Sequence, residues 1–475
     1  MIIPFTTSPQ AAQADLSILA GTPQPVPSFL IHPTGSAREL AAYRRLRRAA
    51  FVTEQGLFAR SDDDDLDDDP RTVVLVATTP DGILLGGVRI APATPADLGW
   101  WTGSRLVTDP SARATGVGPA LIRAACAHAD SAGVLRFEAT VQRRYARLFS
   151  ALGWDTLGDC TVAGRPHVWM RWPLNPIQRL ATATKSFLGP TLQPLRAVPG
   201  GLGPAGFHGD DGAPLPDSEL IAACDAIIPS MVERDPEWAG WCSVLVNVND
   251  LSAMGATPVG LLDAVGAPTR SILERVIAGL AAASAAWRVP VLGGHTQLGV
   301  PAALAVTALG RTRTPIPAGN GVAGDRVRLT TDISGQWRPG YHGRQWDSTS
   351  GRSSQDLALM NQAIASMRPK AAKDVSMAGV VGTLGMMAEA CGTGAELDVV
   401  ALPRPAQATT GAWLTCFPGF GILTAGQGSC APRLPKGVVS AECGSLTARP
   451  GIRLRWPDGV TTTALASPVT GLGQA

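Results

Sequence analysis

Apolar runs divide the first third of the chain into strands and helices. TVVLVA (72–77) and ILLGGVRI (83–90) are joined by TPDG, in which proline presets φ and Asp-Gly closes the turn, so they predict a β-hairpin. Apolar residues recur at helical spacing over 116–130 and a glycine follows, which predicts a helix. A strand at 135–141 and a helix ending at Leu152 come next. The pattern predicts a mixed α+β domain.

The pattern changes after residue 208, where apolar runs of helix length and strand length alternate. AGWCSVLVNVNDLSAMG (239–255) predicts a helix closed by glycine, and an apolar strand follows at 258–266. A second helix at 271–287 leads into a strand and loop at 289–297. This alternation predicts an α/β module.

A third block begins with the predicted strand GDRVRLTTD (324–332) and contains a predicted helix over about 376–391. The buried face of that helix is predicted to hold Met377, Val381, Leu384 and Cys391. From about residue 400, glycine and proline are frequent, and the elements can be assigned only loosely.

Residues 173–208 interrupt both patterns, because proline, glycine and scattered polar residues occur there without sustained periodicity. We therefore place a linker between domains in this segment. The expected fold class is α+β with several domains, a mixed sheet with flanking helices followed by a two-subdomain α/β module. The predicted boundaries are 1–175 for the first domain, 176–208 for the linker and glycine-rich loop, and 209–320 and 321–475 for the two subdomains.

Composition and charge narrow the classes of protein that fit this sequence. Of the 475 residues, 45% are hydrophobic and 16% are charged, which excludes an intrinsically disordered chain. Lys and Arg number 40 against 38 Asp and Glu, and this net charge of +2 is too small for a general nucleic-acid-binding surface. The long uncharged stretches contain glycine, proline and polar residues, so no membrane span is expected.

The N-terminal sequence and the cysteines bear on location. MIIPFTTSPQ lacks the basic and apolar regions of a secretory signal, which predicts a cytoplasmic protein. Eight cysteines, among them Cys430, are scattered without CxxC or Cys/His ligand spacing. We expect reduced packing thiols rather than disulfides or zinc ligands.

Gly116 and Gly118 stand at the start of the helix predicted at 116–130, shortly after Arg113. A helix start offers unpaired backbone N–H groups and the positive end of the helix dipole, and glycine lets a phosphate approach that backbone closely. The segment 113–118 can therefore hold a diphosphate. A tight turn between a strand and a helix is the alternative interpretation.

The first domain resembles the GNAT acyltransferases over about residues 30–175. Residues 113–118 match the family's acyl-CoA pyrophosphate loop, (Q/R)-x-x-G-x-(G/A), and YRRLRRAAFVTEQGLF (43–58) and FSALGW (149–154) agree with the family as well. The resemblance implies that an amine attacks the thioester of acetyl-CoA or another acyl-CoA directly. The residues that it implies for cofactor binding are Arg113, Gly116, Val117 and Gly118.

The same resemblance provides catalytic candidates. The tyrosine that often serves as general acid in the family corresponds to Phe149, and Tyr145 lies one helical turn earlier. Tyr145 is therefore the candidate general acid, with core packing as its alternative role. Glu54 is the candidate general base, or a residue that closes the end of a helix.

Seven aspartates fill the eight positions from Asp62 to Asp69. A solvated loop whose charges repel one another is the first interpretation of such a run. The alternative is that its charge attracts a cationic amine substrate toward the acyl-transfer site.

Acidic and glycine-rich segments recur through the second half of the chain. The run from Gly200 to Gly212 is rich in glycine and contains the pair Asp210 and Asp211. Hard Mg²⁺ ions prefer oxygen ligands, and triphosphates bind metal ions and backbone N–H groups. Further polar candidates downstream are Asp225, Asn247, Asp250, His295, Thr296 and Asp374.

Each of these residues also has an ordinary structural interpretation. Any one aspartate alone fits a turn or a helix N-cap, and Asp374 with Ser376 fits a cap of the next helix. His295 fits a packed loop histidine. Asn247 and Asp250 are three residues apart on a predicted helix, so they face the same side. The combination of all these residues favours a functional site over separate caps and turns.

The ordered set resembles the AIR synthase superfamily, which includes thiamine-monophosphate kinase and selenophosphate synthetase, over about residues 195–475. The matching motifs are GDD at 209–211, a strand aspartate at 225, N-x-N-D-L-x-x-M-G-A-x-P at 247–258, a GGHT loop at 293–296 and DVS at 374–376. The resemblance implies ATP-dependent phosphorylation of a substrate oxygen with Mg²⁺. It also implies a homodimer, because members usually dimerise through the sheet of their first half.

Site residues follow from the same resemblance. It implies metal or phosphate contacts at Asp210, Asp211, Asp225 and Asp250. It implies nucleotide contacts at Gly209, Asn247, Gly293, Gly294 and Thr296, and a catalytic role for His295. The nucleophilic cysteine segment of selenophosphate synthetases is absent before Gly200, and Met377-Ala378-Gly379 follows where thiamine-monophosphate kinases have Asp-Gly. Selenide and thiamine substrates are therefore disfavoured.

The two halves together resemble a bacterial fusion family with an N-terminal GNAT domain and a C-terminal AIR synthase-related domain. The expectation is a bifunctional enzyme that phosphorylates a small-molecule oxygen with ATP and Mg²⁺ and acylates an amine from acyl-CoA. Two alternatives stay open. One is a non-catalytic scaffold that senses CoA and nucleotides, and the other is an ATP-dependent enzyme whose GNAT half only binds or delivers substrate.

Overall fold

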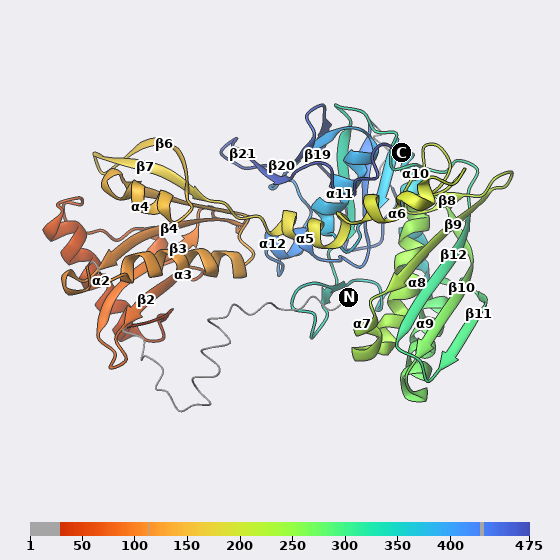
Figure 1. Ribbon diagram of the computed structural model, residues 1–475, viewed down its shortest axis with the longest axis horizontal. Helices are drawn as coiled ribbons and strands as arrows, with labels where there is room; N and C mark the ends of the chain where they lie inside the picture. Colours follow the sequence, from red (N-terminus) through yellow and green to blue (C-terminus); the bar gives the residue numbers. More distant parts are fainter. Residues whose placement is uncertain (1–28, 114, 428–431) are drawn as a thin grey trace. The chain divides into compact units, whose positions relative to one another are not determined.

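The computed structural model describes residues 29–113, 115–427 and 432–475. Cys430 and the N-terminal sequence that was used to predict location lie outside these residues. The described chain forms two compact units, one that ends at Pro173 and one that consists mainly of Leu174–Ala475. Each unit has its own sheets and helices (Figure 1).

A seven-stranded mixed sheet forms the centre of the first unit. Its strands are β1 (Leu30–Pro33), β2 (Val73–Thr78), β3 (Leu84–Pro92), β4 (Trp100–Thr108), β5 (Arg136–Gln142), β6 (Asp155–Val162) and β7 (Arg165–Trp172). They lie in the order β1-β2-β3-β4-β5-β7-β6, and only β4 and β5 pair in parallel. The predicted hairpin is confirmed as the antiparallel pair β2–β3, and the strand predicted at 135–141 is β5.

Helices cover both faces of this sheet. They are α2 (Ala37–Arg48), which continues into a π-helical turn at Ala49–Glu54, α3 (Val117–Ser131) and α4 (Ala146–Ala151). A Cβ on Gly86 would contact Leu121 of α3, whereas a Cβ on Gly87 would contact Tyr43 of α2. Because successive strand residues point to opposite faces, α2 and α3 pack on opposite sides of β3. The helix predicted at 116–130 is confirmed as α3.

The acidic run 62–69 is only partly the solvated loop that the sequence predicts, because Asp63, Asp65 and Asp68 are exposed whereas other aspartates of the run bind arginines. Arg47 Nε donates to Asp62 Oδ2 at 2.7 Å, and Arg47 Nη1 donates to Asp67 Oδ1 at 2.6 Å. Arg89 donates to both oxygens of Asp64, at 2.6 and 2.8 Å. The side chains of Arg47 and Arg89 are buried, so the run folds over them and neutralises their charge. These three aspartates are therefore not free to attract a cationic substrate.

A five-stranded sheet opens the second unit. Its strands are β8 (Ala213–Pro214), β9 (Leu220–Ile227), β10 (Thr257–Ala267), β11 (Val291–Leu298) and β12 (Ala303–Arg311). They lie in the order β11-β10-β12-β9-β8, with β10 and β11 parallel and the other pairs antiparallel. The associated helices are α7 (Pro229–Arg234), α8 (Pro236–Ala253) and α9 (Arg270–Trp287).

The elements predicted over 239–297 are confirmed with one correction. The strand and loop predicted at 289–297 is a strand up to Leu298, because β11 pairs with β10 along almost its whole length. The GGHT segment is therefore part of a regular edge strand and not a loop.

A seven-stranded sheet forms the rest of the second unit. Its strands are β13 (Arg326–Asp332), β16 (Ala371–Asp374), β17 (Gly394–Asp398), β18 (Gly421–Gly426), β19 (Val438–Thr447), β20 (Gly451–Arg455) and β21 (Thr461–Leu465), in the order β16-β18-β13-β19-β17-β20-β21. The helices are α10 (Ser354–Met367), α11 (Gly379–Ala390) and α12 (Thr410–Thr415), and β14 (Gln336–Trp337) pairs with β15 (Trp346–Asp347). The predicted strand at 324–332 is β13.

The helix predicted at 376–391 is α11, with one error on its buried face. Val381 and Leu384 are fully buried, as predicted. Met377 is 48% exposed, because the helix begins only at Gly379, where a φ of +73° reverses the chain direction. Met377 therefore lies in the turn before α11 and not on its face.

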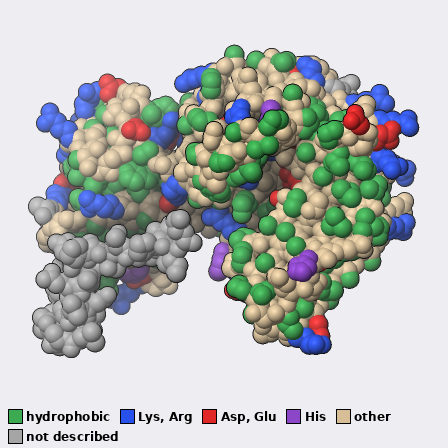
Figure 2. All heavy atoms as spheres, turned by 45° about the vertical axis from the view of Figure 1, so that its right-hand side comes forward, with side chains coloured by type: hydrophobic (Ala, Val, Ile, Leu, Met, Phe, Trp, Pro, Cys, Tyr) green, Lys and Arg blue, Asp and Glu red, His purple; other side chains and the backbone are tan. Residues whose placement is uncertain are grey.

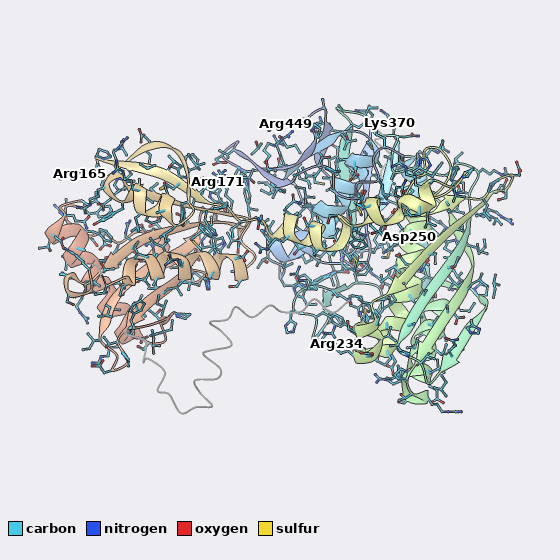
Figure 3. The ribbon with its side chains drawn as sticks, in the orientation of Figure 1. Arg165, Arg171, Arg234, Asp250, Lys370 and Arg449 are labelled. Atoms are coloured by element: carbon cyan, nitrogen blue, oxygen red, sulfur yellow. The ribbon has the colours of Figure 1, made fainter. Side chains whose placement is uncertain are left out.

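Helix α8 lies between elements of the two sheets of the second unit. It packs against β9 and β12 of the five-stranded sheet and also against β16 and α10. Nearly all of its residues are buried, including Asn247 and Asp250. Asp250 thus lies where segments of both sheets meet (Figure 3).

The predicted linker is largely helical. It forms α5 (Pro176–Lys185) and α6 (Leu188–Arg196), and α5 packs against α11 and β21. Pro176 occupies the first helical position of α5, where its missing N–H costs no hydrogen bond, whereas Pro194 lies inside α6. Ile177 and Ala181, one turn apart, are buried. Both helices belong to the second unit, which therefore begins well before residue 209.

No helix among the described residues combines the length and the apolar character that a bilayer-spanning helix needs. The cysteines of the described chain are free thiols, and most of them are buried or half-buried.

Candidate functional site

Three carboxylates from distant parts of the second unit meet at one point. Asp211 follows the glycine-rich run, Asp250 lies in the last turn of α8, and Asp374 ends β16. One oxygen atom of each lies within 4.8 Å of the other two. Asp250 and Asp374 are each 5% exposed, so the cluster is almost completely shielded from water.

Backbone contacts fix the paired aspartates of the GDD motif. Asp211 Oδ2 accepts a hydrogen bond of 2.8 Å from the backbone N–H of Asp374, which joins two of the three segments. Asp210 Oδ2 accepts the N–H of Ala318 at 2.7 Å, and its Oδ1 accepts the N–H of Asp211 at 2.8 Å. Gly209, with a φ of +65°, turns the chain just before the pair. Asp210 therefore anchors the loop, and Asp211 reaches the cluster.

Lys373 brings a positive charge to the cluster. It precedes Asp374 on β16, forms an ion pair with Asp211, and places its Nζ 3.9 Å from Asp210 Oδ1. Burial would lower the pKa of Lys373, but the charges of Asp211 and Asp210 outweigh burial and raise it. Lys373 therefore stays protonated at neutral pH.

A second lysine comes from the segment that the sequence assigns to the linker. Lys185 is the last residue of α5. Burial and the charge of Lys373 lower the pKa of Lys185, and Asp225 opposes this shift. Asp225 belongs to the same electrostatic group, because burial raises its pKa while Lys185 lowers it. The charge of Asp211 also raises the pKa of Asp225, and the metal contact predicted for Asp225 stays a prediction.

The crowding of negative charge changes the protonation of the carboxylates. Burial, followed by the charges of Asp374, Asp225 and Asp211, raises the pKa of Asp250 well above its usual range. Burial and Asp211 raise the pKa of Asp374 in the same way, and burial raises the pKa of Asp210 to about 6. A bound cation would relieve this repulsion and favour the ionised carboxylates.

The donor atoms suit a hard divalent cation. Mg²⁺ coordinates oxygen, and each aspartate of the cluster offers a carboxylate oxygen. Asn247 lies one turn before Asp250 on α8, and its Nδ2 donates to the carbonyl of Ser243 at 2.9 Å. Its buried Oδ1 accepts no hydrogen bond from any residue that the structure describes. A buried oxygen without a donor is destabilising unless a cation or water contacts it, so the residues present fit Mg²⁺.

The GGHT segment lies apart from the cluster within one chain. Gly293, Gly294, His295 and Thr296 are exposed residues of β11, at the edge of the sheet. The strands β10 and β12 separate β11 from β9, a span of about 14 Å at ~4.8 Å per strand. His295 pairs with Ala264, which is also exposed. The catalytic role of His295 and the nucleotide contacts of its neighbours stay predictions.

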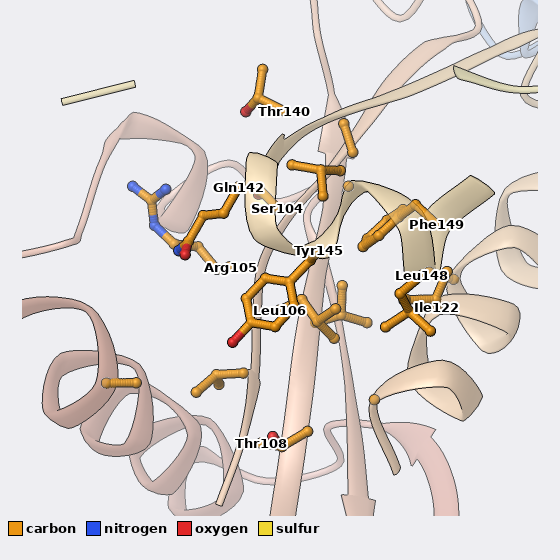
Figure 4. Close-up of a pocket in the computed structure, with 18 of the residues that line it drawn as sticks. Ser104, Arg105, Leu106, Thr108, Ile122, Thr140, Gln142, Tyr145, Leu148 and Phe149 are labelled. Carbon is orange, nitrogen blue, oxygen red and sulfur yellow. The ribbon is translucent and has the colours of Figure 1, made fainter. Parts of the chain in front are cut away.

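A cavity of about 660 Å³ opens in the first unit between β4 and β5 (Figure 4). These parallel strands pair only where residues 100–103 lie beside residues 136–139. The strands continue to Thr108 and Gln142, but they separate beyond Gly103, and the cavity lies between the separated ends. Backbone groups along both ends are therefore free of pairing between β4 and β5.

The start of α3 forms one wall of this cavity. Arg113, Gly116 and Gly118 line it, and Gly116 has a φ of +88°, which glycine adopts without strain. Val117 is fully buried and is the first residue of the helix, so only its backbone is available there. The unpaired N–H groups of this helix start and the guanidinium of Arg113 make the wall suitable for an anion.

Glu54 contacts Arg113 at the rim. Arg113 Nη2 donates to Glu54 Oε2 at 2.5 Å, and this hydrogen bond lowers the pKa of Glu54. A lowered pKa makes a carboxylate a weaker base, so the contact disfavours Glu54 as the general base. The next residue, Gln55, lines the cavity and accepts a hydrogen bond of 2.8 Å from Gln142.

Tyr145 and Phe149 line the cavity one helical turn apart. Tyr145 is 46% exposed, and its ring lies at the cavity in Figure 4, so core packing is the wrong role for it. Phe149 is buried and packs edge-on against Trp154, with ring centroids 5.2 Å apart. The hydroxyl of Tyr145 is thus available to a ligand, whereas Phe149 contributes only an apolar wall.

Comparison with known proteins identifies the domains that contain the two candidate sites. Residues 40–154 match the acetyltransferase (GNAT) family, and residues 209–312 and 351–455 match the N-terminal and C-terminal domains of AIR synthase related proteins. An uncharacterized protein of Synechocystis sp. is 38% identical over 223 residues, which cover 45% of this chain and 69% of that protein. The chain belongs to the AIR synthase related family and carries a GNAT domain. The predicted fusion architecture is confirmed.

Two further proteins are similar to parts of this AIR synthase-related protein. A thiamine-monophosphate kinase of Synechococcus elongatus is 34% identical over 117 residues, which cover 22% of this chain and 36% of that kinase. Among solved structures, AaThiL complexed with AMPPCP and TMP has 19% identity and a TM-score of 0.42, and the match covers 55% of this chain and 89% of that chain. The family domains are those of acyltransferases and of ATP-dependent, kinase-like enzymes in general.

Proposed function

We propose that the AIR synthase-related half binds ATP with Mg²⁺ and phosphorylates an oxygen of a small-molecule substrate. The observation that supports this most is the buried convergence of Asp211, Asp250 and Asp374. Phosphoryl transfer needs little covalent chemistry from the protein and depends on positioned charge. The cluster and the two lysines beside it offer charge of both signs in a site shielded from water.

Each residue of the cluster has a role in this proposal. Asp211, Asp250 and Asp374 would hold Mg²⁺, with Asn247 Oδ1 as a further oxygen. When bound, Mg²⁺ neutralises phosphate oxygens and polarises the phosphoryl group. The hydrogen bond from Asp374 N–H to Asp211 fixes two of the carboxylates relative to each other before any ligand arrives.

For the GNAT half we propose acylation of an amine by acyl-CoA. The start of α3 and Arg113 would bind the diphosphate, and the separated ends of β4 and β5 would offer backbone groups to the rest of the cofactor. The nitrogen of the neutral amine attacks the thioester carbonyl, an amide bond forms, the C–S bond breaks, and the nitrogen releases one proton to water. Tyr145 would protonate the departing thiolate, because Phe149 has no proton to donate.

Binding and turnover measurements distinguish this proposal from its alternatives. Calorimetry of the full chain with MgATP and with acetyl-CoA is followed by assays of ADP and free CoA released in the presence of amine and amide mixtures. Release of both products supports the bifunctional enzyme. Tight binding of both ligands without release supports the scaffold, and ADP release without CoA release supports a GNAT half that only delivers substrate.

Replacing Arg113 by alanine is expected to weaken acetyl-CoA binding roughly 10- to 100-fold, because a charged hydrogen bond contributes about 1.5–3 kcal/mol. ATP consumption should stay unchanged. Calorimetric Kd values for acetyl-CoA provide the measurement, and R123A, which removes an exposed arginine from the same helix α3, is the matched control. An unchanged Kd in R113A would remove Arg113 from the cofactor site.

We also propose that the protein forms a homodimer through the outer face of the five-stranded sheet. Leu262 of β10 is 42% exposed and Leu292 of β11 is 60% exposed, and Ala264 beside them is exposed as well. Hydrophobic side chains are visible over the surface of the second unit in Figure 2. A second copy of the same apolar face would bury these residues in a symmetric interface.

Arginine at Leu262 is expected to convert this dimer into a monomer, because two buried copies of the charge would face each other without a partner. Light scattering after size exclusion measures the mass directly. V322R adds the same charge at a valine that is 53% exposed and outside the sheet, and should leave the mass unchanged. A dimer that persists in L262R would place the interface elsewhere.

A further inference from the structure

Lys373 places its ammonium group beside the buried carboxylates of Asp210 and Asp211, where a metal cation would otherwise be expected. Its ammonium pairs with Asp211 Oδ1 and lies 3.9 Å from Asp210 Oδ1, and its side chain is 8% exposed. Oδ2 of the same Asp211 carboxylate accepts the backbone N–H of Asp374. Through its two oxygens, Asp211 thus contacts both the ammonium of Lys373 and the backbone of Asp374.

The position of this ammonium limits how many divalent ions the site can hold. Each oxygen of Asp210 already accepts a backbone N–H, one from Ala318 and one from Asp211. An ion placed between Asp210 and Asp211 would have to displace Lys373 or lie next to its charge. Repulsion between like charges is strong in a site that excludes water. The space between Asp211, Asp250 and Asp374 adds two further buried carboxylates, whose negative charge offsets that of Lys373.

We propose that Lys373 serves as a built-in cation in place of one divalent ion, so that a single Mg²⁺ binds between Asp211, Asp250 and Asp374. This inference rests on the proposed MgATP-dependent function and specifies its electrostatics. Lys373 is a positioning residue for Asp211 and a fixed point charge for the phosphates, which lysine ammonium groups bind well. The site then needs one metal ion of its own, apart from any that a nucleotide brings.

Counting Mn²⁺ ions on the full chain without nucleotide tests the proposal. Mn²⁺ replaces Mg²⁺ on oxygen ligands, and the electron paramagnetic resonance signal of free Mn²⁺ gives the number bound and the Kd. We expect one tightly bound ion per wild-type chain. K373M should bind a second ion, or bind the first at least tenfold more tightly, because the carboxylates lose their fixed counter-charge. K373R should keep the wild-type count.

Lys370, three residues before Lys373 in the sequence, provides a matched control. It pairs with Asp325 at 2.8 Å, is 45% exposed and lies away from the cluster, so K370M should leave Mn²⁺ binding unchanged (Figure 3). Two or more tight ions on the wild-type chain would overturn the proposal. A folded K373M variant with wild-type Mn²⁺ binding would also overturn it.

Two outcomes separate this inference from the function on which it rests. If the wild-type chain binds no Mn²⁺ at all, the proposed metal site fails, and the role of Lys373 fails with it. If the chain binds two ions and consumes ATP, the function stands and only the role of Lys373 is refuted. If circular dichroism shows that K373M does not fold, the numbers of Mn²⁺ ions bound by the wild type and by K373R test the proposal instead.

Discussion

Asparagine in place of Asp250 is expected to lower Mg²⁺-dependent ATP turnover on the order of 10²- to 10³-fold, comparable to the loss of one preorganised electrostatic contact in other enzymes. The substitution keeps the shape of the side chain but removes one of three charges that would hold the cation. It also removes a buried carboxylate whose own pKa is raised by burial and by the charge of Asp374, so the folded chain should be no less stable. ADP release at saturating MgATP measures the effect, and Mn²⁺ affinity should fall in parallel.

An exposed aspartate gives the control for this substitution. Asp217 lies in the turn between β8 and β9, and asparagine tolerates its φ of +56°. D217N should therefore match the wild type in both assays. ATP turnover in D250N at the wild-type rate would contradict the assignment of the carboxylate cluster as the phosphoryl-transfer site.

Methionine in place of Arg47 is expected to destabilise the first unit by about 3–5 kcal/mol, the usual cost of removing one partner from a buried ion pair. Arg47 has no exposed side-chain surface and donates to Asp62 and to both oxygens of Asp67. Without it, Asp62 and Asp67 would be left buried without this counter-charge. Urea unfolding followed by circular dichroism measures the loss as a shift in the transition of that unit.

The neighbouring Arg48 provides the comparison, since it is exposed on the same helix α2. R48M removes an identical charge and should shift the transition by no more than about 0.5 kcal/mol. Equal losses of stability in R47M and R48M would show that the ion pairs of Arg47 stabilise the unit no more than a surface charge does.

Measuring stability as a function of pH tests the same ion pairs of Arg47 and Arg89 in a second way. Burial would raise the pKa values of Asp64 and Asp67, but hydrogen bonds from Arg89 and Arg47 outweigh it and lower them. A group with a lowered folded pKa stabilises the fold above its unfolded pKa of about 3.9, and this stabilisation is lost as the pH falls through the folded value. Stability of the first unit should therefore drop below about pH 4, and less steeply in R47M.

Helices and strands with a clear pattern of apolar residues could be predicted from the sequence. The helices α3 and α9 each bury one face, and the strands of the hairpin β2–β3 are apolar along their length because both faces of their sheet are covered. The order of the motifs likewise placed Asp211, Asp225 and Asp250 in a common region, because few folds bring such a series together. The structure brings Asp211 and Asp250 together with Asp374, and the roles of these residues stay predictions.

Residues whose role depends on a distant partner were not found. Nothing near Lys185 in the sequence indicates that the end of α5 faces Asp225, and the only sign for Lys373 is that it precedes Asp374. The acidic run 62–69 has the composition of a solvated loop, yet its partner Arg89 lies 25 residues from Asp64. Ion pairs between residues that are far apart in the sequence depend on tertiary structure, and this cannot be deduced from local composition.

Asp211 and Asp374 are 163 residues apart in the sequence, yet a single backbone hydrogen bond joins them beside the proposed ion. An ion that held both would close a very long loop of chain, and it would favour the closed form in proportion to its concentration. Magnesium supply would then govern protein lifetime as well as catalysis. A chain made under magnesium starvation would open more often and present more cleavable backbone to cellular proteases.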